Sequence, residues 1–417
     1  MTARPQINEP PPSPLSIPNF RKLWLGQAIS QVGDGLTNFA VLIVVNQLTG
    51  STFALAAITI SIALPQLLFG LVAGVFVDRW DRKRIMIVSD VLRGLLVLGL
   101  IVVRDPSQVW LFYILSFLQA SVSTFFDPAK GAVMARILER EALLAGNALS
   151  QTTRVVAGVV GTGLAGVLVG LSGTGWPAFT LDSLTFFVST IFIAAMTLPR
   201  YTPQAVTPTN LGSVAAELME GLRFIAGRRV LFAALLTFAV TMLGLGAVNV
   251  LFVPFLTRHL SARTEVLGLF EAAQVIGMVL GSALVATLAA RLKAQWIISA
   301  GVGGVGVLVM LIGMATAWWK VLVALFFVGL LITPVQATAS TLMQQNVPDE
   351  KRGRAGSSLN TATTLASVIS MALAGVLGDT IGIRQVFLLA GSITLGAAVI
   401  AALLLNQTMP APAAERA

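Results

Sequence analysis

Long apolar segments recur along almost the whole chain of 417 residues. Hydrophobic residues make up 56% of the sequence and charged residues 11%, whereas soluble domains contain about 25% charged residues. A helix needs about 20 apolar residues to cross a hydrocarbon core about 30 Å thick, and twelve such segments can be counted. The strands of a membrane barrel would alternate in polarity over about ten residues. We therefore predict an all-α membrane protein with twelve transmembrane helices.

A dense run of charges interrupts these apolar segments. Residues Asp78–Arg84 contain six charged side chains in seven positions, with a long apolar segment on either side. Because charged side chains are costly in hydrocarbon, this run is expected to form a tight turn in water between the second and third helices.

The positions of Lys and Arg predict the orientation of the chain. With a cytoplasmic N-terminus, twenty Lys and Arg side chains fall in inner segments and five in outer loops. Cytoplasmic loops carry such an excess, so both termini are expected in the cytoplasm and the chain in a bacterial cytoplasmic (inner) membrane. The net charge of +9 follows from this topology and from contact with anionic lipid heads. We therefore expect membrane lipids, and no nucleic acid, among the partners.

The longest polar interruption divides the chain near its midpoint. Within it, Leu211–Ala226 carries apolar residues at spacings of three and four, which is typical of an amphipathic surface helix. The N-terminal tail is rich in proline and lacks the apolar core of a secretory signal. We predict a cytoplasmic tail at 1–19, a six-helix bundle at 20–198, a cytoplasmic linker at 199–229, a second six-helix bundle at 230–405 and a cytoplasmic tail at 406–417.

Two short matches indicate an internal repeat. Gln119–Thr124 resembles Gln336–Thr341, and Ala157–Gly161 resembles Ala374–Gly378, with the same separation of 217 residues. A shared separation favours duplication of a six-helix unit. Two such halves are expected to surround a central cavity near the bilayer midplane.

Asp34 is the clearest ionisable group at membrane depth. It lies twelve residues past Lys22, about 18 Å along a helix and close to the midplane. Gln27, Gln31 and Asn38 fall on the same helix face, as expected of the wall of an aqueous cavity; alternatively, Asp34 only pairs with a neighbouring helix. A carboxylate whose surroundings alternate between wet and dry can bind a proton on one side and release it on the other. Asp34 is therefore the first candidate for proton coupling.

Other polar groups at membrane depth are further candidates. Glu271 and Asp182 each lie about two turns inside the outer surface. Either could take part in coupling, bind a cationic substrate or sit in a wet outer vestibule, which is favoured for Asp182. Gln119, Gln336 and Ser340 would line the same cavity or form polar contacts between helices.

Arg154 lies two turns into the fifth span, and two interpretations of it stay open. The guanidinium attracts an anionic group, or it pairs with a carboxylate such as Asp34. Several glycines in the same span would let it approach another helix closely.

The usual groups of enzymes and metal sites are missing from the sequence. The chain has no Cys and a single His, His259, in a short outer loop. It also lacks the Gly-x-x-x-x-Gly-Lys-Ser/Thr loop that binds nucleotide phosphates. We expect neither an enzyme nor a bound metal or cofactor, so a proton gradient would supply the energy for any transport.

Charges of both signs gather at the expected inner mouth. Basic residues alone would serve orientation, so the acids beside them favour a latch of ion pairs that forms in one state and breaks in another. Two of these residues are three positions apart on the third span and hence adjacent. The candidates for this cytoplasmic gate are Gly74, Asp78, Arg79, Arg82, Asp90, Arg93 and Asp127.

The pattern Gly74-x-x-x-Asp78-Arg79-x-x-Arg82-Lys83 resembles the loop between the second and third helices of major facilitator superfamily transporters. The whole chain resembles their twelve-helix drug/proton antiporters, in the macrolide-efflux-like branch. Further matching pieces are Phe20–Gln27, Gly33-Asp34, Phe126-x-Pro128-Ala129 and Pro348-x-x-x-Arg352-Gly353-Arg354. The resemblance implies that Asp78, Arg79 and Arg82 latch the inner side in the outward-facing state, with Asp127 as a partner.

The resemblance also implies a function, with two departures from the family pattern. Thr162 follows Gly161 where the antiporter motif usually has Gly-Pro, and the Arg that many drug antiporters carry in the fourth span is absent from Gln108–Phe126. The implied function is proton-coupled efflux of small amphipathic compounds, neutral or cationic, by a monomer. The alternatives are movement of lysophospholipids or other lipids, or siderophore export.

Overall fold

The computed structural model describes residues 13–198 and 211–406. Twelve of the helices in these ranges are long and apolar enough to cross a membrane, and α7 is a shorter helix between the sixth and seventh of them. The helices are α1 (Pro18–Thr49), α2 (Thr52–Arg79), α3 (Arg82–Gly99), α4 (Val109–Ile137), α5 (Arg140–Ser172), α6 (Trp176–Ala194), α7 (Leu211–Ala226), α8 (Arg229–Pro254), α9 (Leu267–Arg291), α10 (Ala294–Gly313), α11 (Trp318–Asn346), α12 (Asp349–Thr380) and α13 (Ile383–Asn406).

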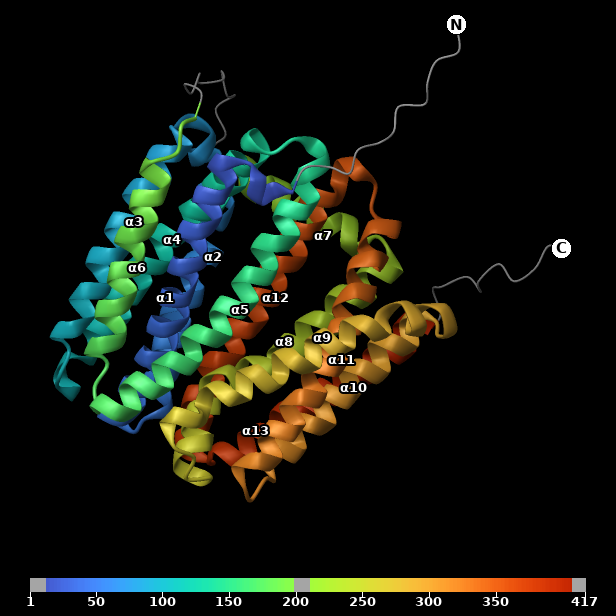
Figure 1. The fold of residues 1–417 in the computed structure, drawn as a ribbon. Helices are drawn as coiled ribbons and strands as arrows, with labels where there is room; N and C mark the ends of the chain where they lie inside the picture. Colours follow the sequence, from blue (N-terminus) through green and yellow to red (C-terminus); the bar gives the residue numbers. More distant parts are fainter. Residues whose placement is uncertain (1–12, 199–210, 407–417) are drawn as a thin grey trace, which may run out of the picture.

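The transmembrane helices form two bundles. Helices α1–α6 lie on one side of the molecule and α8–α13 on the other, with α5 and α12 in the middle (Figure 1). This arrangement confirms the predicted all-α fold with twelve spans. The predicted linker helix forms over the expected range as α7, while linker residues 199–210 and the tail residues 1–12 and 407–417 lie outside the described residues.

The charged run forms the expected tight turn, with two residues between α2 and α3. The Asp81 carboxylate accepts a hydrogen bond of 2.9 Å from the backbone N–H of Arg84 and so caps the start of α3. The ammonium of Lys83 donates to the carbonyls of Ala194 and Met196, both at 2.7 Å, where α6 ends. Two charges of the run therefore satisfy helix ends, which fixes α3 against α6.

The linker helix α7 is attached to the C-terminal bundle. A Cβ added to Gly221 would lie 2.2 Å from the Ser358 hydroxyl of α12, so the two helices are in close contact there. The Glu220 carboxylate also pairs with the Arg354 guanidinium at 2.8 Å. Helix α7 thus packs as an additional element of the second bundle.

Glycines join the two bundles at the end of the molecule away from α7. Gly163 of α5 meets Gly268 of α9, where an added Cβ on Gly268 would lie 2.3 Å from the Gly163 Cα. On the other side, an added Cβ on Gly375 of α12 would lie 2.5 Å from the Ala56 Cβ of α2. Only glycine lets these backbones approach so closely.

The two sequence matches do not join equivalent positions of the two bundles. Helices α4 and α11 start 209 residues apart, as do α5 and α12, whereas the matches are separated by 217 residues. Gln119 lies ten residues after the start of α4, but Gln336 lies eighteen after the start of α11, a difference of about 12 Å in depth. The short matches therefore do not align equivalent positions of the two bundles, and the duplication of a six-helix unit stays a prediction.

Packing of α5 on α1 gives a first prediction. A Cβ added to Gly161 would lie 2.3 Å from the Val32 carbonyl oxygen, whereas one added to Gly158 would have no atom within 4 Å. We expect Gly161→Ala to lower the free energy of unfolding by about 1–3 kcal/mol. Gly158→Ala should be neutral or stabilising by up to about 1 kcal/mol. Thermal unfolding in detergent measures both, and equal midpoints would contradict the packing.

Candidate functional site

A polar cavity of about 580 Å³, including the space open to solvent, lies in the N-terminal bundle. Its walls come from α1, α2, α3 and α4, so among the described residues the C-terminal bundle contributes nothing to its lining. Most of the lining side chains are polar, and most of these are uncharged. The lining residues are Asp34, Asn38, Ile62, Gln66, Arg93, Ser116, Gln119, Ala120, Ser123, Thr124 and Asp127.

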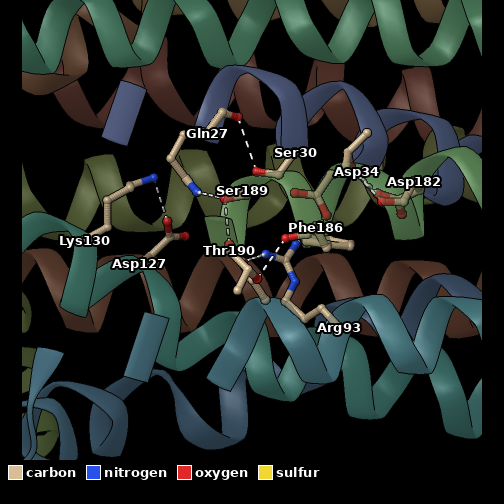
Figure 2. A network of polar contacts seen from close by, with 12 residues as sticks. Gln27, Ser30, Asp34, Arg93, Asp127, Lys130, Asp182, Phe186, Ser189 and Thr190 are labelled. Atoms are coloured by element: carbon tan, nitrogen blue, oxygen red, sulfur yellow. Dashed lines mark hydrogen bonds and ion pairs between the residues drawn. The ribbon is translucent and has the colours of Figure 1, made fainter. Parts of the chain in front are cut away.

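An ion pair between α1 and α3 forms part of the wall of this cavity. The Arg93 guanidinium donates a hydrogen bond to the Asp34 carboxylate (Figure 2). The Arg93 side chain is 6% exposed, whereas that of Asp34 is 29% exposed. The guanidinium also lies over the ring of Phe186, 4.2 Å from its centroid, a favourable contact for a desolvated cation. Asp34 is therefore the member of the pair that water and ligands reach.

Two further carboxylates lie near this ion pair without access to solvent. Asp90 has one oxygen 3.8 Å from the Arg93 guanidinium, and its other oxygen accepts a hydrogen bond of 2.7 Å from Ser189. Asp182 is fully buried, and the Thr185 hydroxyl donates to one of its oxygens at 3.2 Å. One oxygen of each carboxylate lacks a hydrogen-bond donor, which is unusual for buried polar atoms.

Gly33 explains how Asp182 reaches α1. A Cβ at position 33 would lie 2.1 Å from an Asp182 carboxylate oxygen and 2.2 Å from the Thr185 hydroxyl. Gly33 thus leaves room for the Asp182 and Thr185 side chains of α6 against α1. The next residue, Asp34, faces the cavity. The expected wet vestibule around Asp182 is wrong, because its side chain is 0% exposed.

The structure places Asp90 and Arg93 in this buried network and away from the charged α2–α3 turn. Both were expected in the latch at the inner mouth, yet they are 0% and 5% exposed. Helix α3 carries them on its buried face, so their role as gate residues is corrected to that of a network around Asp34.

Asp127 has two cationic partners at the other end of the cavity. Lys130 lies at 3.0 Å and Arg154 at 3.6 Å from the same carboxylate oxygen. The carboxylate beside Arg154 is thus that of Asp127 and not that of Asp34. The Arg154 side chain is 51% exposed, so its other interpretation, attraction of an anionic group, stays a prediction.

The polar stripe on α1 divides between two environments. Asn38 shares the cavity with Asp34. Gln27 and Gln31 instead face a small pocket beside Lys130 of α4, and Gln27 is also within 3.4 Å of the Ser189 hydroxyl. Of the polar residues predicted to share one face of α1 with Asp34, only Asn38 therefore lines the same cavity.

Candidates on the second bundle do not reach this cavity. Gln336 and Ser340 are exposed on α11, at a different depth from Gln119. Helix α9, which carries Glu271, packs against α5, so Glu271 belongs to the junction of the bundles. Thr162 of α5, which stands where the family pattern has proline, is buried.

The predicted inner latch stays a prediction. Gly74 is half-buried five residues before the end of α2, and Arg79 is exposed. The Asp78 side chain lies outside the described residues, and Arg82 has contacts within the protein.

Several lining residues were missed in the sequence. Ser116 and Ser123 lie three residues before and four residues after Gln119 on α4, so the helical period of polar positions was a usable signal. Gln66 follows Pro65 in a segment that is otherwise apolar, where a lone amide also pointed to a polar surrounding.

Metal coordination has no visible basis in the described parts of the chain. Within residues 13–198 and 211–406, no group of three or more His, Cys, Asp or Glu side chains is placed to hold a metal ion.

A bundle of twelve membrane spans with a polar cavity defines a multi-pass membrane transporter. The chain belongs to the transmembrane secretion effector family of the major facilitator superfamily, whose profile matches residues 10–416. This confirms the superfamily that the sequence motifs indicated and makes the chain a transporter rather than an enzyme.

Relatives in bacteria match over most of their length. The chain is 29% identical to the transporter YfiS of Bacillus subtilis, over 88% of this chain and 89% of that protein. It is 25% identical to macrolide efflux protein A of Streptococcus pyogenes, over 91% and 94%. It is 28% identical to the multidrug efflux pump Tap of Mycobacterium tuberculosis, over 86% and 87%.

Solved structures share the fold at low sequence identity. A bacterial homologue of the iron transporter ferroportin superposes with a TM-score of 0.75 at 15% identity, over 92% of this chain and 97% of that one. A bacterial homologue of the lysosomal transporter Spinster gives 0.73 at 12% identity, over 94% and 98%.

The buried network gives a second prediction. Arg93→Gln leaves Asp34 and Asp90 without their cation, so we expect a loss of about 3–5 kcal/mol in the free energy of unfolding. The control Arg154→Gln removes a half-exposed partner and should cost less than about 1 kcal/mol. Denaturation in detergent measures both.

A double variant tests whether charge is the cause. Asp34→Asn in the Arg93→Gln background removes one of the unpaired charges, so it should recover part of the lost stability. No recovery would mean that Arg93 acts through packing on Phe186.

Proposed function

We propose that this protein exports amphipathic small molecules, neutral or cationic, in exchange for protons, acting as a monomer by alternating access. The observation that carries the proposal is the Asp34–Arg93 ion pair in the wall of the cavity. An acid that is reachable from the cavity and held by a buried cation is suited to exchange a proton for a substrate. The proton gradient would supply the energy without a cofactor.

The substrate class is supported by the relatives and by the lining of the cavity. Two relatives are named as a macrolide efflux protein and a multidrug efflux pump. Around the ion pair, the cavity offers amides and hydroxyls such as Gln66, Gln119 and Ser116. These groups hydrogen-bond to uncharged polar atoms of a ligand, while its cationic groups would be drawn to Asp34 when the proton leaves.

The coupling step follows from the position of Arg93 between two carboxylates. When Asp34 binds a proton it loses its charge, and the guanidinium is left with Asp90 as its nearest anion, at 3.8 Å on the same helix. The free oxygen of Asp90 then accepts the bond that Asp34 gives up. Arg93 keeps one anionic partner before and after protonation, so the buried cation is never left alone.

Orientation completes the proposal. With the termini in the cytoplasm, the end at which the glycine contacts join the bundles is the outer end. The described state would then be open to the cytoplasm. From that side the protein would take up a drug and release a proton.

A transport assay tests the coupling. Purified protein in liposomes is given a macrolide, a cationic dye or a lysolipid, with and without an imposed pH gradient. We expect drug or dye transport that the gradient accelerates, and we expect Asp34→Asn to lose this acceleration because no proton binds at position 34. Full gradient dependence in Asp34→Asn would disprove the assignment, and transport of the lysolipid alone would disprove the substrate class.

A neutral change in the same cavity serves as the matched control. Gln119→Ala removes an amide from the wall and leaves the ion pair intact. It should raise the substrate concentration at half-maximal rate by about tenfold, as for loss of a hydrogen bond worth about 1.4 kcal/mol, while the response to the pH gradient is kept.

Orientation has its own test, since the natural chain contains no Cys. Ser107→Cys, in the loop before α4, should react with an impermeant maleimide in intact cells. Arg84→Cys, in the first turn of α3, should react only after the membrane is opened. The reverse pattern would invert the proposed topology.

A further inference from the structure

The turn between α1 and α2 brings two opposite helix ends together. Helix α1 ends at Thr49, Gly50 adopts a left-handed conformation with φ 62°, and α2 starts at Thr52. The carboxyl end of a helix carries partial negative charge and the amino end partial positive charge. The turn therefore presents one end of each sign within a few residues.

A carboxylate from the other bundle binds the amino end of α2. One oxygen of Asp379, at the end of α12, accepts from the backbone N–H of Thr52 at 3.0 Å. Its other oxygen accepts from the Ser51 hydroxyl at 2.9 Å and from the Phe53 N–H at 3.3 Å. Asp379 thus acts as an N-cap supplied across the junction between the bundles.

A guanidinium from the other bundle binds the carboxyl end of α1. Arg258, in the π-helical turn η4 (Phe255–His259), donates to the carbonyl of Gly50 at 2.5 Å and to the side-chain oxygen of Asn46. The Asn46 amide in turn donates to the Thr257 hydroxyl at 3.2 Å. The signs match throughout, because the cation meets the carboxyl end and the anion meets the amino end.

Close packing supports these bonds. An added Cβ on Gly378 would lie 2.6 Å from the Thr52 hydroxyl, and Gly375 meets α2 one turn earlier. The Thr52 hydroxyl also donates to the Gly375 carbonyl at 2.8 Å. Separation of α2 from α12 would break all of these contacts together.

The same helix ends keep local partners if the bundles separate. The Ser51 hydroxyl accepts from the N–H groups of Phe53 and Ala54 at 3.1 and 3.4 Å, so α2 has a cap of its own. The Gly50 N–H donates to the Asn46 carbonyl at 3.1 Å, which closes α1. Water can replace the bonds to Asp379 and Arg258, so the contact can open and close without leaving either helix uncapped.

We propose that Asp379 and Arg258 are the outer gate of this transporter, closing it by binding the two helix ends of the α1–α2 turn. The gate stabilises the state in which the bundles meet at the outer end. It rests on the alternating-access part of the proposed function and is independent of the substrate and of proton coupling.

Spin-label distances test the gate on this chain without native Cys. The outer pair is Ser107→Cys with Thr316→Cys, and the inner pair is Arg84→Cys with Lys293→Cys. We expect Asp379→Ala and Arg258→Ala each to shift the populations about fivefold towards longer outer and shorter inner distances, the effect of losing one helix cap. Asp379→Asn keeps an acceptor oxygen and should shift them less, in the same direction.

Matched controls exist at the same end of the molecule. Asp105 caps a turn within its own bundle by accepting from the Ser107 N–H at 2.9 Å, a bond that lowers the pKa of Asp105 below its ordinary value. Arg384 donates to the Ala315 carbonyl at 3.3 Å, also within one bundle. Because Ser107 is the hydrogen-bond partner of Asp105, the outer labels for the Asp105→Ala control are placed at Trp110→Cys and Thr316→Cys instead. Asp105→Ala and Arg384→Ala should leave the distance populations unchanged.

The outcomes separate the gate from the function on which it rests. If the parent protein interconverts and the gate variants behave like the controls, the gate is disproved and alternating access stands. If the parent shows one population at both ends under every pH and substrate, alternating access fails and the gate fails with it. Gly375→Leu tests the same contact by steric bulk, without a change of charge. Its side chain should force α12 away from α2 and so also lengthen the outer distances.

Discussion

A single buried guanidinium organises the functional half of this protein. Arg93 lies beside the carboxylates of Asp34 and Asp90 and over the ring of Phe186, where solvent barely reaches. In such a setting a lone charge is very costly, so the positions of α1, α3 and α6 are fixed by the need to keep anions beside it. Of this network, Asp34 is the carboxylate that presents an exposed side to the cavity.

Glycines make this arrangement possible by bringing helix backbones together. Gly33 admits the Asp182 carboxylate to the side of α1, and Gly161 lets α5 lie on the other side of the same helix. At the end of the molecule away from α7, Gly375 does the same between the bundles. The same physical device therefore serves two purposes: permanent packing inside one bundle and a separable contact between two.

Sequence alone predicted what depends on position along the chain. The twelve spans, the tight charged turn and helix α7 at Leu211–Ala226 all form as expected, because apolar length and polar interruptions determine them. The partner of Asp34 was not predictable, since a sequence shows the depth of a residue in the membrane but not which helix lies beside it. Arg154 was considered for this role, while the neighbour is Arg93, whose spacing from Asp90 had been read as a feature of the inner mouth.

The one-sided lining of the cavity has a consequence for how cargo would cross the bilayer. Among the described residues, all of its hydrogen-bonding groups belong to the first bundle. A substrate bound there would keep its contacts with the first bundle while the second bundle moves. Water would then reach the substrate on the side that faces the second bundle, while its hydrogen bonds to the first bundle stay in place. Substitutions in the first bundle would then change which substrate binds, and substitutions in the second bundle would change how the two bundles move.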